Sequence, residues 1–365
     1  MKRAFLALFT VTLLAAVAVA QQTQGPPVLQ YEPVPDFFKV PVDRQLGDMV
    51  GVGVNSKGHV FMMSRSDISG PAYGHSAGRI LEWDRNGNFV REIGRNLYAF
   101  AFGHQIRVDR HDNIWVADKG SDMVVKFRPD GQLAMVFGRK AEAYGGGSGY
   151  IGPPNRSKPL NQVGRFLGPA DIAWDSDDNI YVADGYYNSR IAVFNKDGDW
   201  VKSFGEQGSG PGQFRTLHNI AIDGKDRIYV ADRANGRIQV FDRNFTYLYE
   251  WKLNNIPYTH AMSWFGEMIP FGQPAQGTNN PGAPWALCFT RGPNQHLFVG
   301  DGFPGRLYKM TLDGKVVGTY GRSGRLPGQF GWLHGIDCPT ENEIYVADEN
   351  NFRVQKLVLK GAATR

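Results

Sequence analysis

The chain has 365 residues, of which 42% are hydrophobic and 21% are charged, the usage of an ordinary globular protein rather than a disordered one. Its 45 glycines and its 13% of aromatic residues favour many short strands and tight turns over long helices. The formal net charge of +5 is mild, and no stripe of lysine and arginine with interleaved aromatic residues occurs. We therefore expect no nucleic-acid partner.

The N-terminus carries a targeting pattern. Lys2 and Arg3 precede an apolar run over 4–20 that ends in small residues, which is typical of a secretory signal peptide. An uncleaved membrane anchor is the alternative. No later segment reaches the ~18 apolar residues that a spanning helix needs. We expect residues 1–20 to be a signal peptide and 21–365 a secreted or periplasmic protein, monomeric and without a membrane span once the signal is cleaved.

Only two cysteines occur, Cys288 and Cys338. In an oxidising compartment they can pair. As free thiols they would suit buried apolar positions equally well. The sequence leaves both readings open.

A five-residue pattern of the type Ile-aromatic-Val-Ala-Asp recurs along the chain. The five copies, which we call anchors, end at Asp118, Asp184, Asp232, Asp301 and Asp348, and a degenerate sixth covers 60–64. Alternating apolar and polar residues surround each anchor, as expected for half-buried strands. Turn pairs follow at similar offsets, namely Asn86-Gly87, Asp130-Gly131, Asp197-Gly198 and Asp313-Gly314.

Six repeats of roughly four strands, with a period near 45 residues, predict an all-β fold, a six-bladed β-propeller. We expect one domain over 21–365 with its blades at about 45–358. The segment around 28–40 should add a strand to the last blade and close the ring. Long spacings place insertions rich in Gly and Pro near 139–168 and 253–284, on the rim of one face.

An arginine follows most anchors by five or six residues: Arg190, Arg237, Arg306 and Arg353. A structural ion pair between each anchor aspartate and this arginine, bracing the loop between them, is the favoured interpretation.

Histidines recur at one position of the repeat. Counting back fourteen residues from each anchor end gives Val50, His104, Ala170, His218, Leu287 and His334, so histidine occupies every second blade. Alternate blades of a six-bladed ring are about 120° apart, and three imidazoles at one height converge on the central channel. This pattern predicts a three-histidine metal site with an open position for water or substrate. Unrelated core histidines, or a mis-phased blade, are the alternative.

The loops that follow the anchors open on the same face. They carry Arg65, Lys119, Tyr186, Arg233, Phe303 and Glu349. Guanidinium groups match carboxylates with two parallel donors, and a phenol beside a metal ion and a guanidinium loses its proton more easily. Surface contacts of loop residues are the alternative interpretation.

At these residues the chain resembles a known family. The segments DGYYNSR at 184–190 and ADRANGR at 231–237, with the Pro-Gly-Gln-Phe elements at 211–214 and 327–330, are similar to peptidyl-α-hydroxyglycine α-amidating lyases (peptidylamidoglycolate lyases), which are NHL-repeat β-propellers. The resemblance covers about 45–358.

The resemblance implies a zinc-dependent lyase that cleaves the C–N bond of a peptidyl- or N-acyl-α-hydroxyglycine to give an amide and glyoxylate. It implies that zinc, or another divalent transition metal, binds His104, His218 and His334. By the same resemblance Tyr186 is the base, and Arg65 and Arg233 are the active-site arginines, whose individual roles stay open.

The family also holds a structural calcium ion through two backbone carbonyls and an aspartate. The carbonyls fall at Val52 and Ile106, but Gly335 stands at the aspartate position, and Trp332 replaces a methionine of the family's pocket. A non-catalytic NHL-repeat propeller that binds a ligand or protein partner in its channel is the alternative function. A lactonase-type hydrolase would need carboxylate and amide ligands, which the histidine column lacks.

Overall fold

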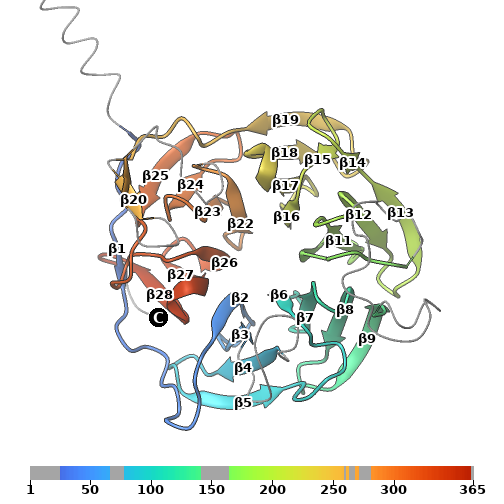
Figure 1. Ribbon diagram of the computed structural model, residues 1–365, viewed down its shortest axis with the longest axis horizontal. Helices are drawn as coiled ribbons and strands as arrows, with labels where there is room; N and C mark the ends of the chain where they lie inside the picture. The colour runs from blue at the N-terminus through green and yellow to red at the C-terminus, as the bar shows by residue number, and fades with distance from the viewer. Residues whose placement is uncertain are drawn as a thin grey trace, which may run out of the picture.

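The computed structural model describes residues 25–65, 78–140, 164–258, 260–262, 268–270 and 281–362. Six four-stranded antiparallel sheets are arranged around a central axis, as Figure 1 shows. The predicted six-bladed β-propeller is thereby confirmed. The expected signal peptide at 1–20 and most of both expected insertions lie outside the described residues.

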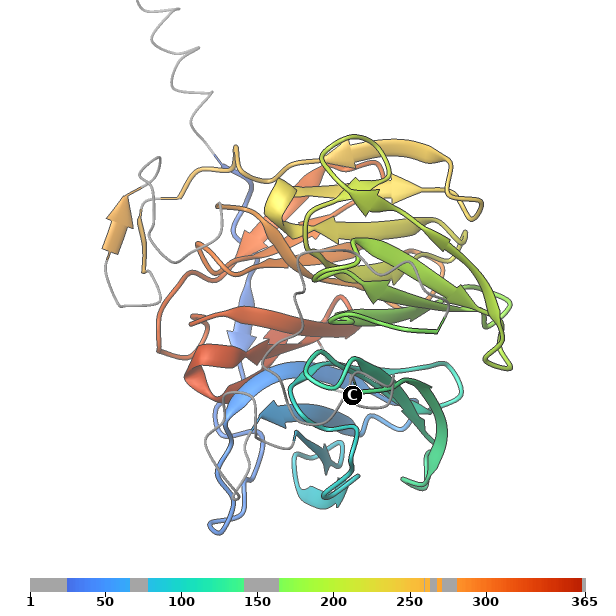
Figure 2. The ribbon, with the colours of Figure 1, turned by 45° about the vertical axis from the view of Figure 1, so that its right-hand side comes forward.

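In blades one to five the strands follow one another outward from the axis in chain order, whereas the outer strand of blade six comes from the N-terminal part of the chain, the blue strand beside the red sheet in Figure 2. Blade one contains Asp48–Val54 (β2), Val60–Arg65 (β3), Arg79–Trp83 (β4) and Phe89–Ile93 (β5). Blade two contains Gly103–Val108 (β6), Ile114–Asp118 (β7), Met123–Phe127 (β8) and Leu133–Gly138 (β9). Blade three contains Asp171–Trp174 (β10), Ile180–Asp184 (β11), Arg190–Phe194 (β12) and Trp200–Phe204 (β13).

The second half of the ring repeats this order. Blade four contains Leu217–Ile222 (β16), Ile228–Asp232 (β17), Arg237–Phe241 (β18) and Tyr247–Trp251 (β19). Blade five contains Pro284–Phe289 (β22), Leu297–Asp301 (β23), Leu307–Met310 (β24) and Val316–Tyr320 (β25). Blade six contains Leu333–Thr340 (β26), Glu343–Asp348 (β27) and Arg353–Leu359 (β28), and its outer strand is Tyr31–Pro33 (β1).

Because β1 pairs antiparallel with β28, residues from both ends of the described chain complete the sixth blade and close the ring. Short strands complete the described elements. They are the parallel pair Glu206–Gln207 (β14) and Gln213–Phe214 (β15), and the antiparallel pair His260–Met262 (β20) and Met268–Pro270 (β21). Among the described residues no helix is long and apolar enough to cross a membrane.

Each anchor forms the second strand of its blade and is buried on both faces, because neighbouring blades pack against both sides of every sheet. Six apolar clusters therefore lie between the blades, one between each pair of adjacent blades. The outer strands are less buried, and in β13 every residue is either exposed or half-buried. The predicted turn glycines Gly87, Gly131, Gly198 and Gly314 have φ between 77° and 93°, which only glycine adopts at little cost.

Cys288 on β22 and Cys338 on β26 form a disulfide bond that joins the innermost strands of blades five and six. Both residues are buried, with at most 7% of their surface exposed. The sequence left open whether the two cysteines pair, and the structure shows that they do. A disulfide of this kind persists in an oxidising compartment.

Candidate metal centre and catalytic site

Three histidines meet on the propeller axis. His104, His218 and His334 lie at the beginnings of β6, β16 and β26, and no more than 2% of each is exposed. One nitrogen of each ring lies within 4.8 Å of the corresponding nitrogens of the other two. Four-coordinate zinc at its usual Zn–N distance separates ligand nitrogens by about 3.3 Å, so each ring needs to move by less than about 1 Å to close on an ion.

A local irregularity aims these side chains inward. The ladder between first and second strands shifts register at His104, at His218 and at His334, where one residue has no partner on the second strand. An unpaired residue of this kind is a β-bulge, and a bulge redirects its side chain away from the alternation of the strand. Each histidine is the bulged residue, which turns its ring toward the axis.

Backbone carbonyls fix the orientation of the three rings. His104 Nδ1 donates to the Ala170 carbonyl at 2.7 Å, and His334 Nδ1 donates to the Val50 carbonyl at 2.7 Å. His218 Nδ1 donates in the same way to the Trp285 carbonyl at 2.8 Å. Each acceptor lies at the equivalent position of the next blade. With Nδ1 protonated, every Nε2 keeps its lone pair, as in histidine ligands held by an outer shell of hydrogen bonds.

The surroundings favour the neutral imidazoles that bind metal ions. Burial lowers the pKa of all three histidines well below the ordinary value of 6.5. Nearby charges add to this effect, Arg233 at His218 and Arg65 at His334. His218 Nε2 is buried and has no hydrogen-bond partner, which costs free energy unless a ligand binds it. The three histidines can therefore hold a metal ion, and the donor set suits zinc.

The blade-five position of this column corrects the sequence analysis. The register of β22 with β23 places Trp285, not Leu287, level with the histidines. The hairpin between these strands is two residues longer than its counterpart in blade four, so a fixed count of fourteen residues back from the anchor stops two residues short of Trp285. The Trp285 ring lies 4.4 Å from that of His218 and 4.5 Å from that of Trp332. An aromatic wall therefore borders one side of the histidine cluster.

Tyr186 lies directly beside the histidines. Its hydroxyl donates to His104 Nε2 at 2.9 Å, and Arg233 Nη1 donates to the same oxygen at 3.4 Å. The ammonium group of Lys119 lies 3.6 Å from the centre of the Tyr186 ring. Burial raises the pKa of Tyr186 above 10.0, whereas Arg233 and then Arg65 lower it. In the protein alone burial outweighs the two guanidinium groups.

The two arginines differ in their partners. Arg65 is buried, donates through Nε to the Gly103 carbonyl at 2.8 Å, and forms an ion pair with Glu349 at 2.6 Å. The second oxygen of Glu349 lies 4.0 Å from His334 Nε2. Arg233 instead stacks on the Trp285 ring at 4.2 Å, and its buried Nε has no hydrogen-bond partner. Glu349 and Asp48, the latter at 3.5 Å, thus neutralise Arg65, while Arg233 forms no ion pair with the described residues.

The anchor aspartates hold the loops that carry these groups. Asp184 pairs with Arg190 at 3.0 Å, and Asp232 pairs with Arg237 at 2.8 Å. Asp348 pairs with Arg353 at 3.0 Å. These pairs bear out the expected ion-pair role in blades three, four and six. In blade five the Asp301 carboxylate accepts instead from the backbone N–H of Arg306.

Phe303 is the member of the predicted loop set that the structure assigns to packing. It is 1% exposed and contacts Ile269 and Tyr258.

Comparisons with known proteins agree with this architecture. A family model described as "6-bladed beta-propeller" matches residues 168–270. Peptidylglycine alpha-amidating monooxygenase of Rattus norvegicus is 34% identical over 165 residues, which is 43% of this chain and 15% of the rat protein. Peptidyl-alpha-hydroxyglycine alpha-amidating lyase 1 of Drosophila melanogaster is 26% identical over 298 residues, 76% of this chain and 48% of the fly protein.

The chain is similar to amidating lyases. This finding confirms the resemblance drawn from the sequence, although the matched region spans at most about half the length of these relatives. NHL repeat-containing protein 3 of Homo sapiens is also similar, 28% identical over 203 residues, 51% of this chain and 53% of the human protein. The solved structure of a streptogramin B lyase has a TM-score of 0.54 and 15% identity, covers 91% of this chain and 98% of its own, and supports the fold.

The calcium site that the resemblance implies does not fit this chain. Val52 on β2 and Ile106 on β6 lie on innermost strands, as expected. No carboxylate stands at Gly335, where a Cβ atom would lie 2.9 Å from the Val50 carbonyl oxygen and 3.3 Å from the side-chain oxygen of Gln105. The approach of neighbouring strands leaves no room for the aspartate.

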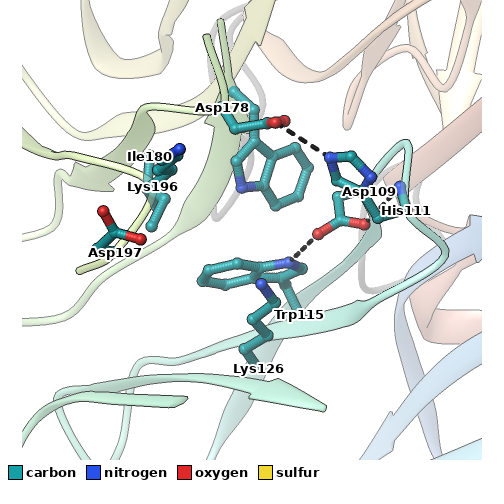
Figure 3. A pocket seen from close by; sticks show the side chains of 9 residues that line it. Asp109, His111, Trp115, Lys126, Asp178, Ile180, Lys196 and Asp197 are labelled. Carbon is teal, nitrogen blue, oxygen red and sulfur yellow. Dashed lines mark hydrogen bonds and ion pairs between the residues drawn. The ribbon is translucent and has the colours of Figure 1, made fainter. Parts of the chain in front are cut away.

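A hollow lies away from the three clustered histidines, between the strand-joining hairpins of blades two and three (Figure 3). It measures about 230 Å³, and its walls include Trp115 and Trp174. Several of its polar side chains are already paired, since Asp109 accepts a hydrogen bond from Trp115 and His111 interacts with Asp178. It adds no group to the histidine site.

Proposed function

We propose that this protein is a metal-dependent carbon–nitrogen lyase that converts a peptidyl- or N-acyl-α-hydroxyglycine into the corresponding amide and glyoxylate. The observation that carries the proposal is the position of the Tyr186 hydroxyl, 2.9 Å from His104 Nε2 and 3.4 Å from Arg233. A base, a metal-ligating cluster and an arginine available for a carboxylate thus lie within one small site. Similarity to amidating lyases supports the same reaction class.

His104, His218 and His334 would hold the ion through Nε2, and zinc is the metal that we propose. A bound divalent cation there would act as a Lewis acid on the substrate hydroxyl and would lower the pKa of the neighbouring phenol.

The chain's own groups would carry the proton. The phenolate oxygen of Tyr186 accepts the proton of the substrate's α-hydroxyl, and the electron pair of that O–H bond forms the new C=O bond. The C–N bond breaks, its electrons pass to the amide nitrogen, and that nitrogen takes a proton. The proton that the nitrogen takes is the one that Tyr186 accepted, so the phenolate is restored. The products are the primary amide and glyoxylate.

Arg233 is the arginine that we assign to the substrate's carboxylate. Its guanidinium lies beside the Tyr186 hydroxyl and has no ion-pair partner among the described residues, and its Nε is unpartnered. Arg65 is already paired with Glu349 at 2.6 Å and with Asp48 at 3.5 Å, so a substrate carboxylate there would meet two carboxylates of the protein. We assign to Arg65 the support of the phenolate charge and of the Gly103 backbone beside His104.

We also propose that the protein works outside the cytoplasm. The disulfide bond between Cys288 and Cys338 supports this location, together with the signal pattern of residues 1–20.

A non-catalytic propeller that binds a ligand in its channel is the second candidate, favoured by the similarity to NHL repeat-containing protein 3. Purified protein loaded with zinc should be incubated with several N-acyl-α-hydroxyglycines, and glyoxylate should be measured colorimetrically against a metal-stripped control. Release above that control, lost in His218→Ala, supports the lyase. Zinc-loaded protein without glyoxylate release for any acyl group would favour the binding module.

A further inference from the structure

The innermost strands line the axis in register. One residue beyond the histidine position, the pairing with the second strands aligns Gly51, Gln105, Asp171, Asn219, Ala286 and Gly335. Two residues beyond it, the same pairing aligns Val52, Ile106, Ile172, Ile220, Leu287 and Ile336. We call the latter set the carbonyl row. An innermost strand has a neighbour on one side only, so alternate carbonyls along it face the axis.

Arg107, on β6, reaches into this part of the channel. Its Nε and Nη2 donate to the two carboxylate oxygens of Asp171, each at 2.8 Å, in a bidentate pair. Nη2 also donates to Asn219 Oδ1 at 3.1 Å and to the Leu287 carbonyl at 3.3 Å. Nη1 donates to the Ile336 carbonyl at 3.2 Å. One guanidinium of blade two therefore contacts blades three, four, five and six.

These partners are the kind of oxygen donors that bind calcium: a carboxylate, an amide oxygen and backbone carbonyls. Two of the carbonyls belong to the carbonyl row, which also contains Val52 and Ile106, the positions at which the resemblance places calcium ligands. The carboxylate comes from Asp171 in blade three rather than from the Gly335 position in blade six.

We propose that the Arg107 guanidinium is the built-in cation of this channel and takes the structural place of the calcium ion. Every strand that it contacts carries part of the histidine shell. Asp171 follows Ala170, whose carbonyl orients His104, and Asn219 follows His218. Ile336 lies two residues after His334. Arg107 is thus a positioning residue for the metal centre.

The test compares the wild type with Arg107→Met, Arg107→Lys and the matched control Arg110→Met. Arg110 lies three residues along the same chain segment, is half exposed and pairs with Asp178. Melting temperatures are measured with and without millimolar calcium, with zinc present throughout. Cobalt(II) binding is titrated through the absorption bands of a tetrahedral site.

Wild type and Arg110→Met should melt at the same temperature with and without calcium. Arg107→Met should melt lower by about 5 °C or more, because Asp171 is left buried without its partner, and calcium should restore part of the loss. Its cobalt affinity should fall by about tenfold or more, as expected when outer-shell support of metal ligands is lost. If Arg107→Met does not fold, Arg107→Lys should show the loss of cobalt affinity instead, because lysine keeps the positive charge but not the planar set of guanidinium donors.

The proposal is overturned if added calcium raises the wild-type melting temperature, or if Arg107→Met matches Arg110→Met in melting temperature and cobalt affinity. The comparison of melting temperatures depends on neither the lyase activity nor the metal centre. Wild type that binds no cobalt would remove the proposed metal function while leaving the calcium comparison as the test of Arg107.

Discussion

Replacing Tyr186 by phenylalanine separates the proposed base from the rest of the site. The ring would keep its contacts with Lys119, at 3.6 Å from the ring centre, and with His104, at 5.1 Å between ring centres. Only the hydroxyl, with its hydrogen bonds to His104 and from Arg233, is removed. Loss of one such hydroxyl costs about 1 kcal/mol of unfolding free energy, so the melting temperature should fall by only about 2–4 °C.

The effect on the rate should be far larger. A general base contributes about 10²–10⁴-fold, so kcat for glyoxylate release at saturating substrate should fall by that factor, which is ~3–5 kcal/mol of activation free energy. Zinc content should stay near that of the wild type because Tyr186 is not among the three clustered histidines. The assay is colorimetric detection of glyoxylate, with metal analysis of the same preparation.

Tyr187→Phe is the matched control, since Tyr187 is adjacent in the chain and its ring lies 6.4 Å from that of Tyr186. This variant should keep wild-type kcat. Tyr186→Phe with kcat within a few fold of the wild type would refute the assignment of the base, even if the lyase activity itself is real.

Three further results are expected. Metal analysis should find about one zinc ion per chain in the wild type and much less in His218→Ala; unchanged zinc would contradict the histidine site. Lysine at Arg233 should reduce kcat/KM for glyoxylate release about tenfold or more, because the point charge of an ammonium group cannot replace the two parallel donors of a guanidinium toward a carboxylate. Lysine at Arg65, which is paired with Glu349, should reduce kcat/KM less. Alanine at both Cys288 and Cys338, which are 50 residues apart in sequence, should cost about 4 kcal/mol of unfolding free energy, measured by denaturant titration; an unchanged midpoint would contradict a stabilising bridge.

The sequence was sufficient to predict the six-bladed ring and the presence of a histidine in every second blade. The anchor pattern recurs because the second strand of every blade is buried on both faces, so each copy meets the same packing requirement. The histidine column followed from the same count, since the hairpins in blades two, four and six allow the same offset from the anchor. In blade five the longer hairpin shifted the count by two residues, and Trp285 was missed. Pairing register, which depends on three-dimensional contacts, corrected it.

Other parts of the site could not be derived from spacing. The assignment of Glu349 to Arg65 joins residues 284 positions apart, across the closure of the ring. Nothing in the local sequence of either residue selects the other. Cys288 and Cys338 likewise pair because β22 and β26, the innermost strands of consecutive blades, pack against each other in the propeller. Trp285 could have been recognised from the sequence as a residue of the site, because a tryptophan at the start of an innermost strand places a large side chain in a narrow channel.

The contacts of Arg107 explain what the lack of an aspartate at Gly335 indicates about the channel. A ring of carbonyls facing an axis concentrates partial negative charge, and this charge needs a cation or a set of donors. When the chain lacks the carboxylate that would complete a calcium site, the same carbonyls still require partners. The Arg107 guanidinium supplies three nitrogen donors there, with Asp171 as its counter-ion. Glycine at position 335 and arginine at position 107 therefore belong together: the first removes a calcium ligand, and the second supplies the positive charge in its place. Both residues lie on strands that hold the histidines.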